Sequence, residues 1–185
     1  TASRSVVVSE GPLRGFSFKL ATDHPHGPKG ELQSGKADTS DDVLVALTHS
    51  EHITKMDRVL GSDNELIVLK EVATVAEKKS QIGTVIRDIR QLDDGNYYLP
   101  ALSIPYMGRD IAKLNGEPYE VFWKKHYAEI LGRAKAKLLL RYGIQMETPN
   151  SQNMLIQLDR NLKPTGKIVF RDVSDALYVK GVSDQ

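Results

Sequence analysis

The chain has 185 residues, of which 40% are hydrophobic and 26% charged, as is ordinary for a globular protein with a buried core. Lys and Arg number 25 against 24 Asp and Glu, and this near-zero balance argues against nucleic acid as a partner. The lack of cysteine excludes disulfides, iron–sulfur clusters, thiolate zinc sites and a thiol nucleophile. No apolar run approaches the ~18 residues of a membrane span and no signal peptide is evident, so we expect a cytoplasmic protein with no membrane partner. Because the chain opens at Thr1, without methionine, within sequence typical of folded structure, we expect a fragment of a longer protein.

A hairpin is predicted near the start of the chain. Residues 6–8 and 16–20 have the composition of strands, and Gly11 with the proline after it indicates the turn between them. Apolar and polar residues alternate in the second strand, which predicts that Lys19 points away from the core face. The ordinary alternative to a functional role for Lys19 is a solvated lysine on an edge strand.

A long loop is predicted over residues 23–42, followed by a helix over residues 49–60 and a buried strand over residues 66–69. The loop contains His24 and His26 with one proline between them. They lack an obvious third ligand, so a polar loop is favoured over a zinc site.

Two more strands are predicted over residues 84–89 and 97–104. The Asp-Asp-Gly-Asn sequence at 93–96 favours a tight turn, and hence a hairpin, between them. Residues 1–107 are therefore expected to form an antiparallel-sheet region.

The longest helix is predicted to open at Pro118 and to stop before Gly143, which suits the left-handed residue after a helix end. An aromatic and aliphatic stripe recurs at three- and four-residue spacing and is expected to face the core, with the lysines on a solvated face. Residues 108–185 are expected to form a second region of helix plus hairpin. The fold class predicted is α+β: an antiparallel sheet packed with a long helix, followed by a β-hairpin.

That hairpin joins the apolar runs 154–156 and 168–170 through a loop containing Pro164 and Gly166. Antiparallel pairing would bring Asn153, before the first run, close to Asp172, after the second. An amide oxygen and a carboxylate form a hard-oxygen site suited to Mg²⁺ held together with substrate phosphates.

Polar residues beside the predicted strands offer cations, amides and carboxylates but no nucleophile–base signature. This combination weakly favours phosphate binding, in which catalysis is mostly positioning and charge stabilisation. Neither a GxxxxGK[ST] loop nor a GxGxxG motif is present. The residues concerned are Arg4, Lys19, Glu71, Arg87, Gln152, Asn153, Arg171 and Asp172.

The stretch RYGIQMETPNSQNMLIQLD followed by KIVFRD, over residues 141–172, resembles the signature of the NRPS-independent siderophore (NIS) synthetases, the aerobactin-type, IucA/IucC-like family. Weaker features follow in the family's order. TASRS at the start is similar to its Ser/Thr-rich SxRT-type motif, and GFSFKLA is similar to its next strand with a central lysine. The resemblance implies the fingers-like part (1–107) and the palm-like part (108–185) of a larger synthetase.

The resemblance implies an ATP- and Mg²⁺-dependent ligase that adenylates a carboxylate of citrate or a related acid, with AMP-forming chemistry in siderophore biosynthesis and iron acquisition. An amine or hydroxyl then attacks the acyl-adenylate, and a homodimer is the expected assembly. Arg4 and Lys19 would act in catalysis, and Asn153 and Asp172 would lie at the metal. The residues expected to bind ATP are Ser3, Arg4, Ser5, Lys19, Gln152, Asn153, Arg171 and Asp172.

Some positions depart from the family pattern. Asn150 stands where the family has histidine, Glu147 lies one position too far from Asn153, and Ser5 replaces threonine. Two alternatives therefore stay open. One is a kinase-like phosphotransferase, although no HRD-type base precedes Asn153. The other is a non-catalytic relative that binds nucleotide.

Overall fold

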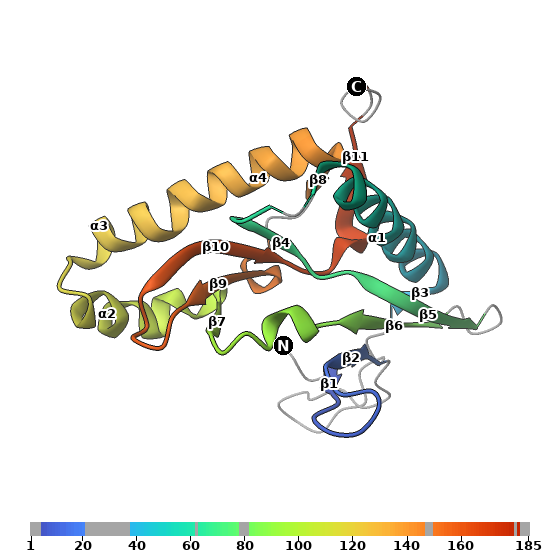
Figure 1. The fold of residues 1–185 in the computed structure, drawn as a ribbon, viewed down its shortest axis with the longest axis horizontal. Helices are drawn as coiled ribbons and strands as arrows, with labels where there is room; N and C mark the ends of the chain where they lie inside the picture. Colours follow the sequence, from blue (N-terminus) through green and yellow to red (C-terminus); the bar gives the residue numbers. More distant parts are fainter. Residues whose placement is uncertain are drawn as a thin grey trace, which may run out of the picture.

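The computed structural model describes residues 5–20, 38–61, 63–77, 82–146, 150–179 and 181, and it has the predicted α+β fold. Two sheets lie one after the other along the molecule, with α1 (Ser40–Leu60) at one end and α2 (Ile104–Leu114) and α3 (Tyr119–Trp123) at the other (Figure 1). Within the described part of the chain, no helix is both long and apolar enough to cross a bilayer.

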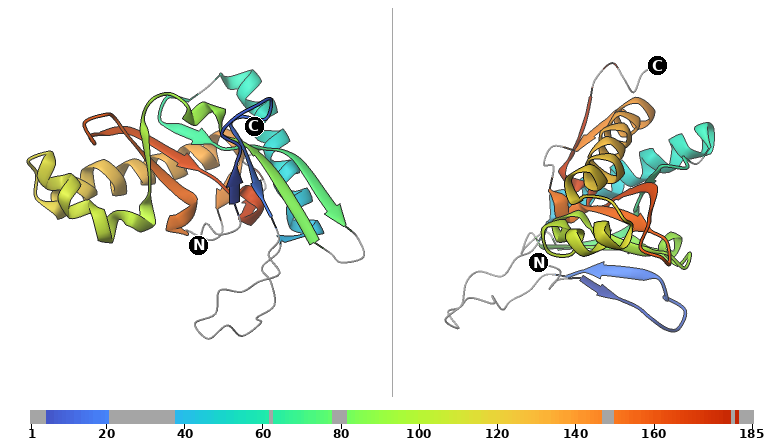
Figure 2. Two further views of the ribbon diagram at one scale, coloured as in Figure 1. Left: turned by 90° about the horizontal axis from the view of Figure 1, so that it is seen from below. Right: turned by 90° about the vertical axis from the view of Figure 1, so that its left-hand side faces the viewer.

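The first sheet is antiparallel and contains the predicted N-terminal hairpin. Its strands run in the order β1-β2-β6-β3, and β5 also pairs with β6. Figure 2 shows the short hairpin strands beside the longer pair formed by β5 and β6. The bounds are β1 Ser5–Val7, β2 Phe16–Lys19, β3 Asp38–Thr39, β5 Glu71–Glu77 and β6 Ile82–Asp88.

Helix α1 covers one face of this sheet and begins earlier than predicted. Thr39 accepts the backbone N–H of Asp42, and Asp42 accepts that of Thr39, so a capping box starts the helix inside the stretch that we expected to be loop. The helix also approaches the sheet closely at Gly83, where a Cβ atom would lie only 2.5 Å from a methyl group of Val43. Val43, Ala46 and Val85 form the small core of this contact.

The second sheet has the order β4-β10-β9-β7 and contains the predicted C-terminal hairpin. Strands β9 and β10 pair antiparallel with Phe170 opposite Met154, which confirms that prediction, while β4 joins β10 in parallel. The bounds are β4 Leu66–Val68, β7 Tyr97–Pro100, β9 Met154–Leu158 and β10 Pro164–Phe170.

The predicted hairpin around residues 93–96 is wrong, because β7 pairs with β9 and not with β6. Asp94 explains the difference. Its carboxylate accepts hydrogen bonds from Asn96, from the Tyr98 hydroxyl and from the buried Gln157 amide of β9, so the turn is tied to the second sheet. The strand predicted over residues 97–104 also ends early, and α2 follows with a proline in its first turn.

The predicted long helix runs from α3 through a π-helical turn, Lys124–Ala128, into α4 (Glu129–Tyr142). It stops where predicted, because Gly143 takes the left-handed conformation at φ 62° and its N–H donates to the Leu139 carbonyl. A short sheet of β8 (Ile144–Met146) and β11 (Ala176–Tyr178) follows and was not predicted.

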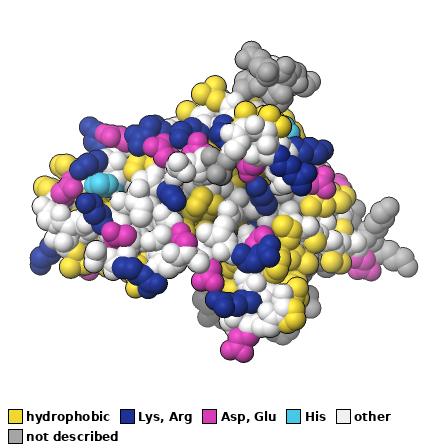
Figure 3. All heavy atoms as spheres, viewed as in Figure 1, with side chains coloured by type: hydrophobic (Ala, Val, Ile, Leu, Met, Phe, Trp, Pro, Cys, Tyr) yellow, Lys and Arg dark blue, Asp and Glu magenta, His cyan; other side chains and the backbone are white. Residues whose placement is uncertain are grey.

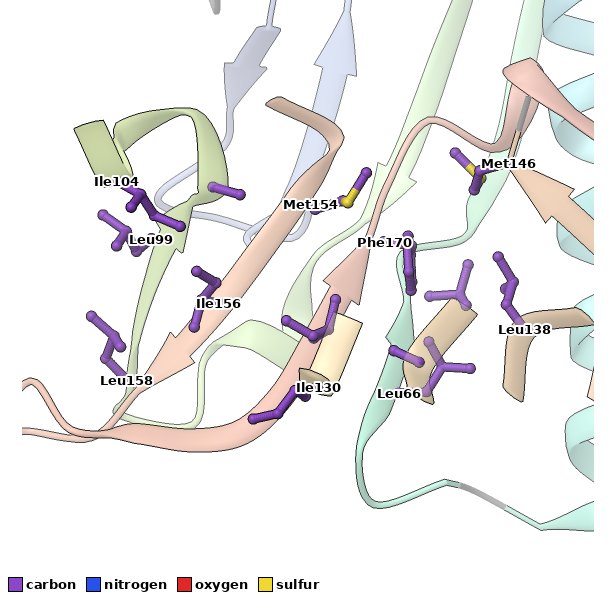
Figure 4. Close-up of a cluster of buried hydrophobic side chains, with 14 of the residues drawn as sticks. Leu66, Leu99, Ile104, Ile130, Leu138, Met146, Met154, Ile156, Leu158 and Phe170 are labelled. Atoms are coloured by element: carbon purple, nitrogen blue, oxygen red, sulfur yellow. The ribbon is translucent and has the colours of Figure 1, made fainter. Parts of the chain in front are cut away.

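The main core lies between the second sheet and the long helix. Figure 4 shows Ile156 and Leu158 of β9 and Phe170 of β10, together with Ile130 and Leu138 of α4. Strands from both predicted regions share this sheet, since β4 and β7 lie in 1–107 and β9 and β10 in 108–185. The boundary between residues 107 and 108 stays a prediction.

Asp63 is expected to make stability depend on pH in the acid range. Its Oδ1 accepts the backbone N–H groups of Glu65 (2.8 Å) and Leu66 (3.0 Å) and lies 3.1 Å from Lys137 Nζ. Burial alone would raise the pKa of Asp63, but these donors hold it below its ordinary value. The ionised form is therefore favoured in the folded state, and its contribution is complete above pH ~4 and lost as pH falls through the depressed pKa.

Asp63→Asn should lower the free energy of unfolding by about 1 kcal/mol at pH 7 and by much less at pH 3, as measured by urea denaturation. Asp93→Asn is the matched control, because that carboxylate pairs with Arg14 while 70% exposed and should change little at either pH. An equal loss for Asp63→Asn at both pH values would contradict the prediction.

Candidate functional site

Strand β10 ends between the first sheet and α1, and an ion-pair cluster forms at that point. Lys19 Nζ, from β2, lies 2.9 and 3.0 Å from the two carboxylate oxygens of Asp172 and 3.1 Å from Asp38 Oδ2. The three side chains are only 15–17% exposed. The first sheet thus supplies a cation to the residue that follows the second sheet's central strand.

A row of buried polar residues crosses the first sheet beside this pair. Ser17, Arg87 and Glu71 are paired across β2, β6 and β5. Arg87 donates from Nε (2.9 Å) and from a terminal nitrogen (2.6 Å) to Glu71 Oε1, while Ser50 of α1 donates to Glu71 Oε2 (3.0 Å). The same arginine lies 3.6 Å from Asp172 Oδ1. Arg87 therefore links the buried Glu71 to the Asp172 cluster.

Asp172 is held in an unusual backbone conformation, with φ 67° and ψ 60° in the left-handed region. Such strain in a residue other than glycine persists where the surroundings impose it, and it is common at functional sites. Part of that constraint comes from α1, because His49 Nδ1 lies 2.8 Å from the carbonyl oxygen of Val173. Burial would raise the pKa of Asp172, but the charges of Lys19 and Arg87 outweigh it and hold the pKa below its usual value. The carboxylate is ionised at neutral pH.

Asn153 and Arg171 face each other across the start of the hairpin, where the Arg171 N–H donates to the Asn153 carbonyl at 3.0 Å. Asn153 is 3% exposed, yet its side-chain amide makes no hydrogen bond to any described residue. The Arg171 guanidinium likewise forms no ion pair within the described part of the chain. Burial and the charge of Arg87 lower its pKa. Near the end of β10, the buried Asn153 amide thus lacks a hydrogen-bond partner among the described residues, while the partly exposed Arg171 guanidinium interacts with the charge of Asp172 but has no close ion pair.

The structure places the predicted residues as follows. Lys19, Asn153, Arg171 and Asp172 gather around the end of β10, and Ser5 pairs with Lys19 in the β1–β2 register. Gln152 belongs to the 3₁₀ turn Ser151–Asn153. Ser3, Arg4 and Glu147, like the His24/His26 loop, lie outside the described residues.

The orientation predicted for Lys19 is wrong. Ser17, on the same side of β2, is 7% exposed, and that side carries the buried polar row and contacts the Asp172 cluster. Strand β2 is also internal to its sheet, between β1 and β6. A lysine on this side is therefore paired and largely covered, which the alternation of apolar residues within β2 could not indicate.

Sequence reasoning missed the residues that support the cluster from α1 and β3. His49 and Ser50 are adjacent in α1, and Asp38 lies at the start of β3. The only signal was a pair of polar residues within a predicted helix and an acid in a predicted loop. Asn150, which departs from the family pattern, caps the 3₁₀ turn by accepting the Gln152 N–H.

Asp172 and Asn153 offer oxygen atoms of the type that binds Mg²⁺ together with phosphates, and both carboxylate oxygens of Asp172 accept from Lys19 in this structure. A carboxylate and a buried amide oxygen without a hydrogen-bond donor are hard ligands of the kind that Mg²⁺ prefers, and Mg²⁺ commonly uses one or two protein ligands plus phosphate oxygens. Within the described ranges, no group of three or more His, Cys, Asp or Glu side chains could hold a metal by itself. The fit therefore requires a phosphate-bearing ligand.

The visible surface carries no large field of one sign. In Figure 3, Lys and Arg side chains line the upper edge of the molecule with Asp and Glu side chains between them. This distribution agrees with the near-zero net charge and offers no broad basic surface on that face.

Comparison of the sequence with protein-family models gives no match, and comparison with curated proteins gives none either. The features that bear on function are therefore the cluster at Asp172 and the stretch 141–172 that resembles the siderophore synthetases.

Proposed function

We propose that this chain carries the ATP·Mg²⁺ site of a siderophore synthetase of the NRPS-independent type, an AMP-forming ligase. The observation that carries the proposal is the Asn153 amide, which is 3% exposed and makes no hydrogen bond to a described residue, at the strand end that also carries Arg171 and Asp172. A polar group buried without a partner, as the Asn153 amide is, is costly unless a ligand satisfies it. An anion would suit Arg171, and Asn153 and Asp172 would be the residues to hold a cation that accompanies it.

Each residue of the cluster has a role in the proposal. Lys19 and Arg171 would bind phosphate oxygens, and Ser5 and Gln152 would line the nucleotide site. Arg87 is paired with Glu71 and would hold the position of Asp172. Asn153 and Asp172 would hold Mg²⁺, which when bound neutralises phosphate charge. The protein's contribution would be preorganised charge around the α-phosphate, where the carboxylate of a citrate-like acid attacks and pyrophosphate leaves.

The test is calorimetric titration with ATP, with and without Mg²⁺, followed by analysis of the products in the presence of citrate and other dicarboxylates. We expect Mg²⁺-dependent ATP binding and formation of AMP and pyrophosphate. Formation of ADP would indicate a phosphotransferase instead, and binding without products would indicate a non-catalytic relative. Absence of ATP binding at millimolar nucleotide would overturn the proposal.

A further inference from the structure

The first sheet brings Lys19 and Asp38 to one of its faces, although they belong to different strands. Strand β2 pairs with β6 so that Lys19 lies opposite Val85, and β3 pairs with β6 so that Asp38 lies opposite Gly83. Residues two positions apart on a strand share a face of the sheet, and here that face is the one that α1 covers. The segment that follows β10 packs against α1 as well (Figure 1), which brings Asp172 to the same point.

One ammonium group is held there by two carboxylates from distant parts of the chain. Lys19 Nζ lies 2.9 and 3.0 Å from the two oxygens of Asp172 and 3.1 Å from Asp38 Oδ2. All three side chains are largely covered. The two carboxylates thus converge on a single point at which a cation lies, and that cation belongs to the protein itself.

The surroundings of this point are negatively charged in spite of the lysine. Asp175 responds to them, because desolvation and then the charges of Asp172, Asp42 and Asp38 raise its pKa, while Lys19 only partly offsets them. A carboxyl group whose pKa is raised by its neighbours lies where a further positive charge is favoured.

The other cations near Asp172 do not remove this excess of negative charge. Arg87 lies 3.6 Å from Asp172 Oδ1, but it donates two hydrogen bonds to the buried Glu71. Arg171 acts on Asp172 through its charge, without a close ion pair among the described residues. Within the described part of the chain, the carboxylates at this point are Asp38, Asp42, Glu71, Asp172 and Asp175, and the cations are Lys19, Arg87 and Arg171.

From this arrangement we propose that Asp38 and Asp172 together form a divalent-cation site, and that the Lys19 ammonium takes the place of the metal in its absence. Lys19 and Mg²⁺ exclude one another, because both need the same carboxylate oxygens. Asp38 is thus a further metal ligand, outside the set of residues that the resemblance assigns to the site. Once displaced, the ammonium is free to bind a phosphate oxygen. The inference rests on the proposed function, which assigns Asp172 to Mg²⁺.

The test uses Mn²⁺ without nucleotide, because Mn²⁺ prefers the same oxygen ligands as Mg²⁺ and the paramagnetic resonance signal of free Mn²⁺ measures how much is bound. The parent chain should bind Mn²⁺ with a Kd on the order of millimolar or weaker, since Lys19 holds both carboxylates. Lys19→Met should tighten binding by about tenfold or more, because it removes a unit charge from the position of the metal. Lys19→Gln should give the same gain, and circular dichroism checks that both variants fold.

A second substitution separates a direct ligand from a nearby charge. In the Lys19→Met background, Asp38→Asn should remove the gain in Mn²⁺ affinity. Asp175→Asn removes the same charge from an exposed side chain nearby and should weaken binding by only about two- to threefold. Lys70→Met controls for the loss of a lysine. Its ammonium pairs at 2.6 Å with Asp57, outside the cluster, so Mn²⁺ binding should stay as in the parent chain.

The outcomes separate this inference from the proposed function. Mg²⁺-dependent ATP binding by the parent chain, with no gain in Mn²⁺ affinity in either Lys19 variant, would overturn the inference and leave the nucleotide site standing. Equal effects of Asp38→Asn and Asp175→Asn would also overturn it. A gain that depends on Asp38 in a chain that binds no ATP would support the cation site and overturn the proposed function. If the Lys19 variants do not fold, Asp38→Asn alone should weaken the residual Mn²⁺ binding of the parent chain by about tenfold, and unchanged binding would overturn the inference.

Discussion

Glu71→Ala should lower the free energy of unfolding by about 3–5 kcal/mol, the largest loss of stability that we expect from a single substitution. Glu71 is 2% exposed, and it accepts two hydrogen bonds from Arg87, which is itself 6% exposed. Removing the carboxylate would leave a buried guanidinium without its main partner and the Ser50 hydroxyl without its acceptor. Denaturation by urea, followed by Trp123 fluorescence, measures the loss.

The matched control is the double variant Glu71→Leu/Arg87→Met, which removes both charges and fills similar volume. Because replacing a whole buried ion pair by apolar residues is often neutral, this double variant should be much more stable than Glu71→Ala. A loss below about 1 kcal/mol for Glu71→Ala, or an equal loss for both variants, would show that the buried pair does not carry the stability assigned to it.

Asp172→Asn should abolish Mg²⁺-dependent ATP binding, and any AMP formation should fall by about 10²–10³-fold, as for the loss of one preorganised charge contact. Asparagine tolerates the left-handed backbone conformation that Asp172 adopts, so this variant removes the charge without adding backbone strain. It would also leave Lys19 without one of its two carboxylate partners. Calorimetry with ATP at several Mg²⁺ concentrations measures the effect.

Asp175→Asn is the control for this prediction. Asp175 lies in the 3₁₀ turn Val173–Asp175, directly after Asp172, but its side chain is exposed. Partial desolvation and the neighbouring carboxylates, chiefly Asp172, raise the pKa of Asp175, so its neutralisation relieves repulsion and should not weaken nucleotide binding. Unchanged ATP affinity in Asp172→Asn, together with an unchanged dependence on Mg²⁺, would contradict the proposed role of this carboxylate.

Local sequence signals predicted the elements whose causes are local. The hairpin from Met154 to Phe170, the stop of the long helix at Gly143 and the strand that begins at Leu66 all follow from periodicity and turn residues, and the structure confirms them. The same pairing rule placed Asn153 beside the segment that contains Asp172, because antiparallel register is fixed once the two runs and the loop are known. The position of Asn153 next to the segment that contains Asp172 could therefore be predicted from the sequence.

Only the tertiary structure determined the other half. The side of β2 that Lys19 shares with Ser17 faces the cluster because α1 and the end of β10 come to that side of the first sheet, and neither is near β2 in the sequence. The buried pair of Glu71 and Arg87 depends on β5 and β6 lying side by side. Strand β7 does not pair with β6, because the Gln157 amide of β9 donates to Asp94 and ties the turn before β7 to the second sheet. Ion pairs and sheet partners of this kind join residues far apart in the chain, so residue spacing determines where strands and turns form, whereas packing between the two sheets determines which charges meet at Asp172.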